Sequence, residues 1–311
     1  MTDVRKSGLV AIAGRPNAGK STLLNRVLGS AVSIVTPKAQ TTRERVLGIL
    51  TEKQGQIVFV DTPGIHSAKK GGFNEFMVHE AAEALDGPNL IWYLVDPDSA
   101  PEHEKAVLTI LDSKADRSTP IWILLNKSDL GREVSQFGKT IEDQLKAFGF
   151  KTVRTLSISA RRGAGVDTLV SETWSLIPNG PFLFSDEEQI SDRPLRFFVA
   201  EKIREQLFLK LGDELPYSCA VEITKYNEKS DPIRIEAVIH VERDSQKGMV
   251  IGAKGHKIKE IGTAARQSIE SFIGGTIFLG LQVKVLPHWT RNADNLKKLG
   301  YHLPQDKRKS Q

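Results

Sequence analysis

Short, almost wholly apolar runs alternate with amphipathic stretches from Gly8 to Ile177. The apolar runs are four to six residues long, which is typical of strands covered by helices on both faces of a sheet. Strands and helices that alternate along a chain favour the α/β class, with a mainly parallel sheet and flanking helices. The predicted strands are Leu9–Ala13, Val46–Leu50, Ile57–Val60, Leu90–Val95, Ile121–Leu125 and Val153–Ile158. The predicted helices are Ser21–Leu28, Phe73–Leu85, Lys105–Lys114, Thr140–Phe148 and Val166–Leu176.

The pattern changes after the last of these helices. The segment from Pro178 to Pro194 carries three prolines and an acidic cluster, which is typical of a linker. The stretches after it predict a second domain of the α+β class in the order α-β-β-α-α-β. Its elements are the helix Phe197–Leu211, the strands Cys219–Tyr226 and Ile233–Val241, a helix–turn–helix around Ile251–Lys257, the helix Ile258–Ile273 and the strand Ile277–Leu286. We predict domains over residues 1–178 and 197–290, a linker over 179–196 and a basic tail over 291–311 that ends in a disordered QDKRKSQ.

Basic residues gather near the end of the chain. The 311 residues suit two domains, and the 40% of hydrophobic residues are enough for a core in each. The net charge is +5, but Arg243 to Gln311 carry 13 Lys and Arg against 5 Asp and Glu, whereas the residues before them carry 30 against 33. A basic excess gathered in one segment points to a polyanion such as nucleic acid.

The cysteine content and the beginning of the chain bear on its compartment. Cys219 is the only cysteine, so the chain has no internal disulfide and suits a reducing compartment. A catalytic thiol is an alternative, but Cys219 lies in an alternating apolar stretch and no histidine motif accompanies it, which favours a core residue. The first residues, MTDVRKSGLV, lack the apolar segment of a signal peptide, and the longest apolar runs are too short to cross a bilayer. We therefore expect a cytoplasmic protein.

A glycine-rich loop with the spacing G-x-x-x-x-G-K-S joins the first predicted strand to the first predicted helix. Gly19 lets the backbone approach closely, so the amide groups of residues 17–21 can point at a β-phosphate from a helix N-terminus. Lys20 can reach the β- and γ-phosphate oxygens, and the Ser21 hydroxyl can ligate Mg²⁺. A chance turn would lack the flanking strand and helix, so we interpret the loop as a nucleotide phosphate site. The predicted nucleotide-binding residues here are Gly14, Asn17, Ala18, Gly19, Lys20, Ser21 and Thr22.

A second phosphate motif, Asp-Thr-Pro-Gly, ends the third predicted strand. The Asp61 carboxylate suits Mg²⁺, through a water, and Gly64 can offer its backbone N–H to a γ-phosphate. Between the two motifs runs PKAQTTRERV, where a threonine can close on Mg²⁺ when the γ-phosphate is present. Thr41 and Thr42 are both candidates, and we predict Thr42. The predicted metal ligands are Ser21, Thr42 and Asp61, and the predicted catalytic residues are Lys20, Thr42, Asp61 and Gly64.

A third motif, Asn-Lys-x-Asp, indicates which base is bound. Asn126, Lys127 and Asp129 follow a buried strand. An ionised Asp129 accepts two hydrogen bonds, which guanine offers from N1–H and its 2-amino group and adenine does not. The stem of Lys127 can lie over the base. After the last strand of this domain, the backbone N–H groups of Ser159 and Ala160 can face guanine O6.

The hydrolysis step lacks an obvious water-positioning side chain. Many GTPases use a glutamine directly after the Asp-x-x-Gly motif to orient the attacking water. Ile65 occupies this position and cannot hydrogen-bond to water. His66 is an alternative, although a solvated loop histidine is the favoured interpretation. We expect slow intrinsic hydrolysis, with the water positioned by backbone, a cation or a partner.

A basic Gly-x-x-Gly loop lies in the second domain, between two helical stretches. Such a loop lets a nucleic-acid backbone approach closely, and in a KH domain it clamps about four nucleotides of single strand. Gly-x-x-Gly alone is often only a turn, but the α-β-β-α-α-β order and the positive charge of this segment favour RNA binding. The predicted RNA-binding residues are Gly252, Ala253, Lys254, Gly255, His256, Lys257 and Lys259.

With these motifs in this order, the chain resembles the Era family of bacterial GTPases from end to end. The matching segments are GRPNAGKSTLLN, QTTR, DTPGIH, NKSD, SISA, LPYSCAVEI and GMVIGAKGHKIKEIG. The resemblance implies a P-loop GTPase domain followed by a type II KH domain, with GTP and GDP as substrate and product and Mg²⁺ as cofactor. It also implies binding to the 3′ end of 16S rRNA, a role in assembly of the small ribosomal subunit, and peripheral contact with the inner membrane. Asn17 matches a position that holds K⁺ in similar GTPases, and we expect a monomer.

Two other functions compete with this interpretation. One is a different translation-associated GTPase, with tandem G domains or a role in tRNA modification. The single set of GTPase motifs and the intact Gly-x-x-Gly loop argue against it. The other is an RNA-binding module whose nucleotide site is only structural. Phosphate release measured with and without RNA distinguishes these functions.

Overall fold

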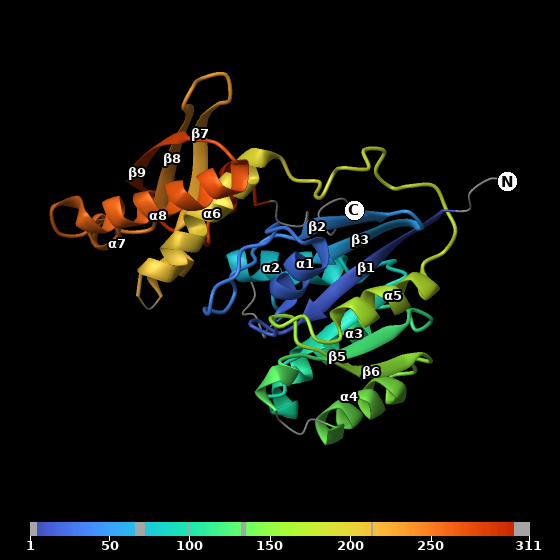
Figure 1. Ribbon diagram of the computed structural model, residues 1–311. Coiled ribbons are helices and arrows are strands. Elements are labelled where there is room, and N and C mark those ends of the chain that lie inside the picture. The colour runs from blue at the N-terminus through green and yellow to red at the C-terminus, as the bar shows by residue number, and fades with distance from the viewer. Residues whose placement is uncertain (1–4, 66–71, 99, 132–134, 213, 302–311) are drawn as a thin grey trace, which may run out of the picture. The chain divides into compact units, whose positions relative to one another are not determined.

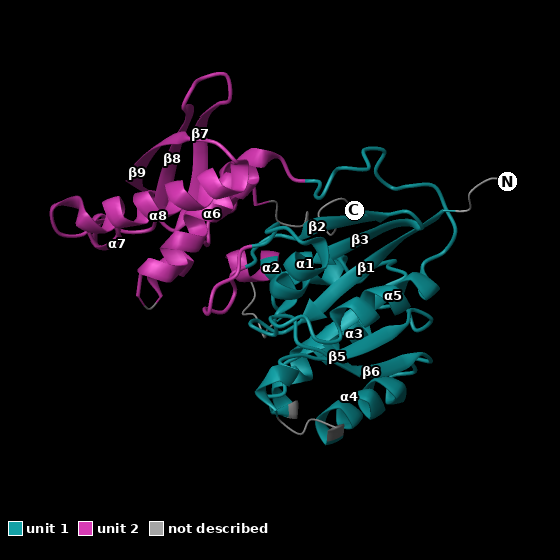
Figure 2. Ribbon diagram, in the orientation of Figure 1, with its two compact units in different colours: residues 1–33, 42–68, 77–192 teal, residues 34–41, 69–76, 193–311 magenta. Residues whose placement is uncertain are grey.

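The computed structural model describes residues 5–65, 72–98, 100–131, 135–212 and 214–301. His66 and the terminal QDKRKSQ lie outside these residues, so what we expect of them stays a prediction. The chain divides into two compact units (Figure 2). Unit 1 consists of residues 1–33, 42–68 and 77–192, and unit 2 of residues 34–41, 69–76 and 193–311.

Unit 1 is built on a sheet that, within the described residues, has six strands in the order β2-β3-β1-β4-β5-β6 (Figure 1). Its strands are β1 (Lys6–Gly14), β2 (Val46–Glu52), β3 (Gly55–Asp61), β4 (Leu90–Val95), β5 (Ile121–Leu125) and β6 (Val153–Ser157). Strands β3, β1, β4, β5 and β6 run parallel, and the edge strand β2 runs antiparallel to β3. The predicted mainly parallel sheet is therefore confirmed, and the carboxyl ends of β1, β3, β4, β5 and β6 meet at one edge.

Helices cover both faces of this sheet. They are α1 (Lys20–Leu28), α2 (Gly72–Glu83), α3 (Lys105–Lys114), α4 (Ser135–Ala147) and α5 (Val166–Leu176). On one face, a buried core joins Ala81 of α2, Leu111 of α3 and Ile141 of α4 to the strands. Helix α1 contacts α5 and the strands β1 to β3. This two-sided cover explains why β4 and β5 are apolar throughout.

Helix α4 begins earlier than predicted. The predicted helix starts at Thr140, whereas α4 starts at Ser135 and so includes Gly138, a residue type that lowers helix propensity. In the structure Gly138 lies inside the helix, against Thr155 and Leu125. A Cβ at residue 138 would lie 2.9 Å from Thr155 Cγ2 and 3.0 Å from Leu125 Cδ1. The absence of a side chain at Gly138 therefore permits the close packing of α4 on β5 and β6.

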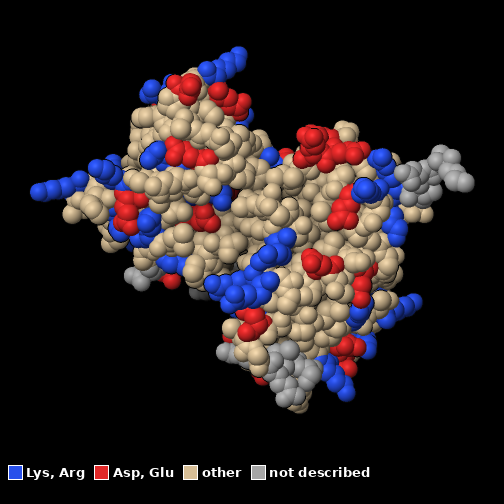
Figure 3. Space-filling model, in the orientation of Figure 1, with Lys and Arg blue, Asp and Glu red and all other residues tan. Residues whose placement is uncertain are grey.

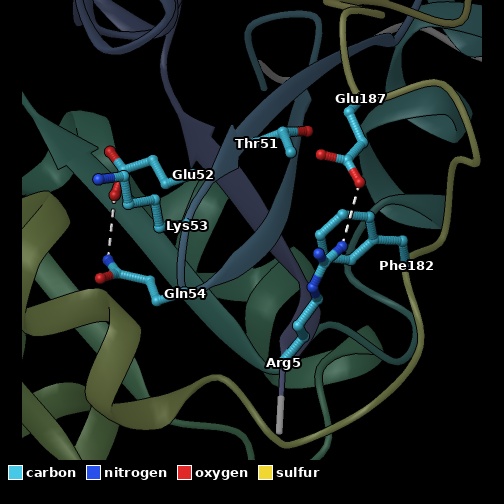
Figure 4. A pocket seen from close by; sticks show the side chains of 7 residues that line it. All are labelled: Arg5, Thr51, Glu52, Lys53, Gln54, Phe182 and Glu187. Carbon is cyan, nitrogen blue, oxygen red and sulfur yellow. Dashed lines mark hydrogen bonds and ion pairs between the residues drawn. The ribbon is translucent and has the colours of Figure 1, made fainter. Parts of the chain in front are cut away.

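The proline-rich segment after α5 lies along the edge of the sheet in unit 1. The backbone N–H of Ile49 donates to the Ile190 carbonyl (2.9 Å), and Ser191 Oγ donates to the Leu47 carbonyl (2.6 Å). These hydrogen bonds occupy polar groups that an edge strand otherwise exposes. Phe182 and Glu187 of this segment both contact Arg5, whose guanidinium group lies over the Phe182 ring and pairs with the Glu187 carboxylate (Figure 4). The three residues line a pocket of about 870 Å³ together with Thr51, Glu52, Lys53 and Gln54, none of which is a predicted site residue.

Unit 2 has the predicted α-β-β-α-α-β order. Its elements are α6 (Leu195–Lys210), β7 (Ala220–Asn227), β8 (Ile233–Val241), α7 (Asp244–Ile251), α8 (His256–Ile273) and β9 (Ile277–Val285). Strand β8 pairs antiparallel with β7 and parallel with β9 (Figure 1). Val199 of α6 and Ala265 of α8 pack with Ile235 of β8 in one core. Cys219 is fully buried in a neighbouring core, which supports its interpretation as a core residue.

After β9 the chain runs through the last residues of the predicted second domain, Trp289 among them, into the predicted tail from residue 291. A short helix, α9 (Ala293–Lys298), forms there, with the Asn292 side chain accepting a hydrogen bond from the Asn295 backbone N–H (3.0 Å). Trp289 is fully buried, and its Nε1–H donates to the Ser218 carbonyl (2.9 Å). The sequence analysis does not predict this helix, because six residues are too few for an apolar period to show.

No helix within the described part of the chain combines the length and the apolar character that crossing a membrane requires.

Candidate functional site

The glycine-rich loop joins β1 to α1 at the edge of the sheet in unit 1. Gly14 ends β1 at φ 148°, and a Cβ there would lie 2.4 Å from the Leu94 carbonyl oxygen. Gly19 precedes α1 at φ 101°, and a Cβ there would lie 2.2 Å from Asn126 Nδ2. Both glycines are thus required by backbone conformation and by close contacts. The loop brings the N-terminus of α1 to the end of β1, as anion binding at a helix N-terminus needs.

Lys20 is buried below this loop. Its side chain is only 6% exposed, and Nζ donates to the carbonyls of Gly14 (3.1 Å) and Arg15 (2.9 Å). Burial lowers the pKa of Lys20 to about 8, although the carboxylates of Asp61 and Glu104 oppose the shift. A desolvated ammonium group held by two carbonyls can turn to phosphate oxygens, which replace those acceptors and add negative charge.

Three side-chain oxygens from separate segments meet beside the loop. Ser21 Oγ donates to Asp61 Oδ2 (2.8 Å), and Thr42 Oγ1 lies 2.9 Å from Ser21 Oγ. Asp61 Oδ1 is buried and accepts no hydrogen bond from the described residues. Burial raises the pKa of Asp61, while Lys20, the hydroxyl donors Ser21 and Ser33 and the backbone of Thr62 oppose the shift. A buried carboxylate oxygen without a donor, next to two hydroxyl oxygens, fits a hard cation such as Mg²⁺.

The structure distinguishes the two candidate threonines. Thr41 Oγ1 donates to the Lys38 carbonyl (2.8 Å) and lies 2.8 Å from Thr36 Oγ1. Its hydroxyl is therefore engaged within its own loop. Thr42 instead faces Ser21, so the geometry favours Thr42 as the threonine of the predicted metal site.

The end of the Asp-Thr-Pro-Gly motif packs against the glycine-rich loop. A Cβ at Gly64 would lie 2.5 Å from the Pro16 backbone nitrogen, so only glycine permits this approach. The backbone N–H of Ile65 donates to the Gly14 carbonyl (3.1 Å), and the Ile65 side chain is fully buried in the core under the sheet. Ile65 therefore cannot orient a water molecule, as its side-chain chemistry already indicates.

Asn126 connects the phosphate loop to the loop after β6. Its Nδ2 donates to the Ala18 carbonyl (2.7 Å), and its Oδ1 accepts from the Ala160 backbone N–H (2.9 Å). The side chain is 3% exposed. Both ends of the amide thus bind protein groups, which gives Asn126 an anchoring role that the motif alone does not reveal.

Asp129 and Lys127 have partners that orient them at the same edge of the sheet. Ser159 Oγ donates to Asp129 Oδ1 (2.6 Å), and this hydrogen bond lowers the pKa of Asp129. Lys127 pairs with Asp96 at the end of β4. The carboxylate is thereby kept ionised, as acceptance of two guanine donors requires.

The sequence predicts that the N–H groups of Ser159 and Ala160 face guanine O6. In the structure these groups donate instead to the Ala164 carbonyl (2.9 Å) and to Asn126 Oδ1 (2.9 Å). Both N–H groups have acceptors inside the protein, because the tight loop after β6 folds back on itself, so a contact of either group with O6 stays a prediction. The Ser159 hydroxyl donates to Asp129.

The Gly-x-x-Gly loop joins α7 to α8 in unit 2. Gly252 has φ 71°, and a Cβ there would lie 2.6 Å from Lys257 Cβ. Lys254 adopts φ 49°, so the loop turns sharply and exposes the Lys254 side chain. Ala253, His256 and Lys259 are exposed as well. Figure 3 shows basic side chains at the end of the unit that carries α7.

One basic residue of this loop is already paired. Lys257 Nζ lies 2.9 Å from Glu260 Oε2, and Lys210 Nζ of α6 lies 2.9 Å from Glu260 Oε1. These two lysines hold the pKa of Glu260 down to about 2. Lys257 therefore offers an RNA phosphate less free charge than Lys254 and Lys259 do.

Three residues around the phosphate site are not among the predicted site residues. Glu104 is fully buried, accepts from Tyr93 Oη (2.7 Å) and lies 3.7 Å from Arg15 Nη1 of the loop. Ser33 donates to Asp61, and Asn25 binds the backbone of Ser33. Asn25 has a detectable signal, since it lies four residues after Ser21 on the same face of α1. Glu104 and Ser33 belong to no recognisable spacing.

Two family models match the chain. One, described as a 50S ribosome-binding GTPase, matches residues 9–127. The other, described as a KH domain, matches residues 214–290. The first covers the phosphate motifs and part of the base motif, and the second covers the Gly-x-x-Gly loop.

Curated relatives resemble the chain over nearly its whole length. The GTPase Era of Geobacter sp. (strain M21) is 44% identical over 301 residues, which cover 95% of this chain and 98% of the relative. The GTPase Era of Coxiella burnetii (strain Dugway 5J108-111) is 39% identical over 294 residues, which cover 94% and 97%.

Two solved structures share the complete fold. A crystal structure of an Era variant from Aquifex aeolicus bound to GDP and AlF4⁻ is 37% identical, with a TM-score of 0.87 and coverage of 96% of this chain and 100% of that one. A crystal structure of Era in complex with MgGDPNP and nucleotides 1506–1542 of 16S ribosomal RNA is also 37% identical, with a TM-score of 0.86 and the same coverage.

Proposed function

This chain belongs to the Era family of GTPases, and we propose that it hydrolyses GTP to GDP and phosphate, binds the 3′ end of 16S rRNA and acts in assembly of the small ribosomal subunit. The observation that carries the proposal is the pairing of a guanine-nucleotide site in unit 1 with a basic Gly-x-x-Gly loop in unit 2. An Era structure of 37% identity holds both MgGDPNP and a 16S rRNA segment. The domain boundaries that we propose are 1–178 for the GTPase domain, 179–196 for the linker, 197–290 for the KH domain and 291–311 for the tail.

The chemistry that we propose for unit 1 is transfer of the γ-phosphoryl group of GTP to water. Lys20 binds the β- and γ-phosphate oxygens and Gly64 donates its N–H to the γ-phosphate. Ser21, Thr42 and Asp61 would hold Mg²⁺, directly or through water, and a cation held there would neutralise charge on the phosphates. Asp129 selects guanine. We propose that Thr42 ligates Mg²⁺ when the γ-phosphate is present, which makes the loop around it a switch.

We include K⁺ in the proposal because water positioning has no side chain assigned to it. Ile65 is buried, and Asn17, at φ 63° in the phosphate loop, matches the position that holds K⁺ in similar GTPases. We expect hydrolysis to be several-fold faster in KCl than in NaCl at equal ionic strength, since a cation near the β–γ bridge stabilises developing negative charge. Rates of phosphate release in the two salts check this. In an Asn17→Ala variant the difference should shrink, and equal rates for the parent chain in both salts contradict the potassium site.

We place RNA binding at the Gly-x-x-Gly loop. The double variant Ala253→Asp and Lys254→Asp sets two carboxylates where the RNA backbone passes. Repulsion of phosphates and loss of counterion release should weaken binding of a 16S 3′-end oligonucleotide at least tenfold at low salt and flatten its salt dependence. Filter binding at several salt concentrations measures both effects, and GTP binding should be unchanged because the nucleotide motifs lie in unit 1.

A matched control exists in the β7–β8 hairpin. The double variant Asn227→Asp and Lys229→Asp changes the charge of unit 2 by the same amount. The hairpin lies at the beginning of β8, whereas α7 and the Gly-x-x-Gly loop follow the end of β8. RNA affinity should therefore fall much less in the control. A folded loop variant with the affinity and salt slope of the parent would place the RNA site elsewhere.

Phosphate release separates the proposed function from its rivals. We expect slow release from the chain alone and a different rate when the 16S 3′-end oligonucleotide is bound. An RNA-binding module with a structural nucleotide site binds both ligands but releases no phosphate. Another translation-associated GTPase releases phosphate at a rate that this RNA does not change. Co-sedimentation with isolated 30S and 50S subunits tests the proposed small-subunit partner, since one matching family model is described by the 50S subunit.

The proposal also extends to cellular context. We propose that the protein is a cytoplasmic monomer with peripheral contact to the inner membrane, as the family resemblance implies. Flotation with anionic vesicles tests the membrane contact, and light scattering of the GDP complex tests the oligomeric state.

A further inference from the structure

A serine outside every recognised motif binds the carboxylate that we assign to the metal site. Ser33 Oγ donates to Asp61 Oδ2 (2.9 Å), and the residue is only 6% exposed. Ser33 stands 28 positions before Asp61 in the sequence, on the segment that follows α1. Its hydroxyl therefore reaches Asp61 only because the fold returns this segment to the end of β3.

The backbone of Ser33 is held in place from α1. Asn25 Oδ1 accepts from the Ser33 backbone N–H (2.9 Å), and Asn25 Nδ2 donates to the Ser33 carbonyl (2.7 Å). An amide that binds both polar groups of one residue restricts its position and its rotation. Asn25 lies on the same face of α1 as Ser21, so one helix positions both hydroxyl groups that donate to Asp61.

The two hydroxyl groups that donate to Asp61 have different roles when a cation is bound. Asp61 Oδ2 accepts from Ser21 and from Ser33, whereas Oδ1 has no donor among the described residues. Ser21 has one hydroxyl proton and gives it to Asp61, so Thr42 is the donor in the Ser21–Thr42 pair. If Ser21 ligates the cation, its oxygen lone pairs turn to the metal. Of the two side-chain donors to Asp61, Ser21 then also ligates the cation, whereas Ser33 only donates its hydrogen bond.

We infer that Ser33 is a positioning residue, which holds Oδ2 of Asp61 so that Oδ1 faces the divalent cation of the nucleotide site. The inference rests on the proposed GTPase function and adds to it an outer layer of the metal site, consisting of Ser33 and its anchor Asn25. Partners that orient a metal ligand typically change metal affinity by about 10- to 100-fold when they are removed. Ser33 acts on the cation through Asp61 and on GDP only through the cation.

Direct titration with Mn²⁺ tests this role without a measurement of turnover. The full-length chain is loaded with GDP, and free Mn²⁺ is followed by its electron paramagnetic resonance signal. We expect Ser33→Ala to weaken Mn²⁺ binding by about 10- to 100-fold. The affinity of this variant for GDP in excess EDTA should equal that of the parent, because we infer that Ser33 acts on GDP only through the cation. Ser33→Thr, which retains the hydroxyl, should recover part of the Mn²⁺ affinity.

Ser191→Ala is the matched control. Ser191 is 7% exposed, and its hydroxyl donates to the Leu47 carbonyl in the same unit. Ser191→Ala removes the hydroxyl hydrogen bond of a buried serine, as Ser33→Ala does, yet its Mn²⁺ affinity should not change. If circular dichroism shows that Ser33→Ala does not fold, Asn25→Ala serves as the test. This variant keeps the Ser33 hydroxyl but removes the hydrogen bonds that hold the Ser33 backbone, so it should also weaken Mn²⁺ binding.

The experiment distinguishes a failure of the Ser33 role from a failure of the proposed GTPase function. Parent-like Mn²⁺ affinity in folded Ser33→Ala, or in folded Asn25→Ala where that variant decides, overturns the role of Ser33 and leaves the GTPase function intact. A parent chain that takes up neither GDP nor Mn²⁺ contradicts the proposed function itself.

Discussion

Asp129→Asn is expected to weaken the binding of GTP and GDP by about 10- to 100-fold, which corresponds to one charge-assisted hydrogen bond. The carboxylate accepts from both N1–H and the 2-amino group of guanine, whereas an amide presents one acceptor and one donor. The donor of the amide would meet the 2-amino group. Xanthosine triphosphate carries an oxygen at that position, so the variant should bind it better than the parent chain does. Fluorescence titration with GTP and with xanthosine triphosphate measures this change in base preference.

The pKa of Asp129 supplies a second check. The Ser159 hydroxyl, the largest cause, lowers this pKa below its ordinary value of 3.8. A group with a lowered pKa loses its contribution only as the pH falls through that lowered value. GTP affinity should therefore not decline through Asp129 between neutral pH and about pH 5. Asp143→Asn, an exposed position on α4, is the control and should leave both nucleotide affinities unchanged. An Asp129→Asn variant that keeps GTP affinity and still rejects the xanthosine nucleotide contradicts the base assignment.

Lys20→Ala is expected to have the largest effect on phosphate binding. Two charge-assisted hydrogen bonds, to a β- and a γ-phosphate oxygen, are lost, at roughly 1.5–3 kcal/mol each. The GTP affinity should fall by at least about 100-fold, and phosphate release should fall to the background rate. The loss for GTP should exceed the loss for GDP, because GDP has no γ-phosphate. Equilibrium binding of fluorescent nucleotides and phosphate release under saturating GTP measure the two effects separately.

Lys114→Ala provides a charge-matched control. Lys114 ends α3 in the same unit and is exposed, so its removal should alter neither quantity. Lys20→Arg should recover little, since the planar guanidinium group is larger than the ammonium group in a buried site and binds with a different geometry. Parent-like turnover in folded Lys20→Ala would exclude Lys20 from catalysis.

The amino-acid sequence by itself determined those features that depend on neighbours in the chain. Strands β4 and β5 and helices α3 and α5 begin and end at the predicted residues, and the two strands are uninterrupted apolar runs bounded by polar or proline residues. The spacing of the glycine-rich loop predicted a strand before it and a helix after it, and both are present. The order of elements in unit 2 followed from alternating and helical patterns in the same way. These inferences succeed because backbone conformation within one element is a local property.

Tertiary structure alone decided which side chains meet. The sequence offers Thr41 and Thr42 as neighbouring candidates, of which we predict Thr42, and only the fold shows Thr42 facing Ser21 while the hydroxyl of Thr41 stays in its own loop. The motif predicts a nucleotide contact for Asn126, and only the structure shows that both ends of its amide also bind protein groups. The physical reason is that hydrogen bonds join groups by distance in space, and parallel strands bring together residues far apart in the chain. Ser33 and Asp61 are 28 positions apart, and no local pattern records that their side chains lie 2.9 Å from one another.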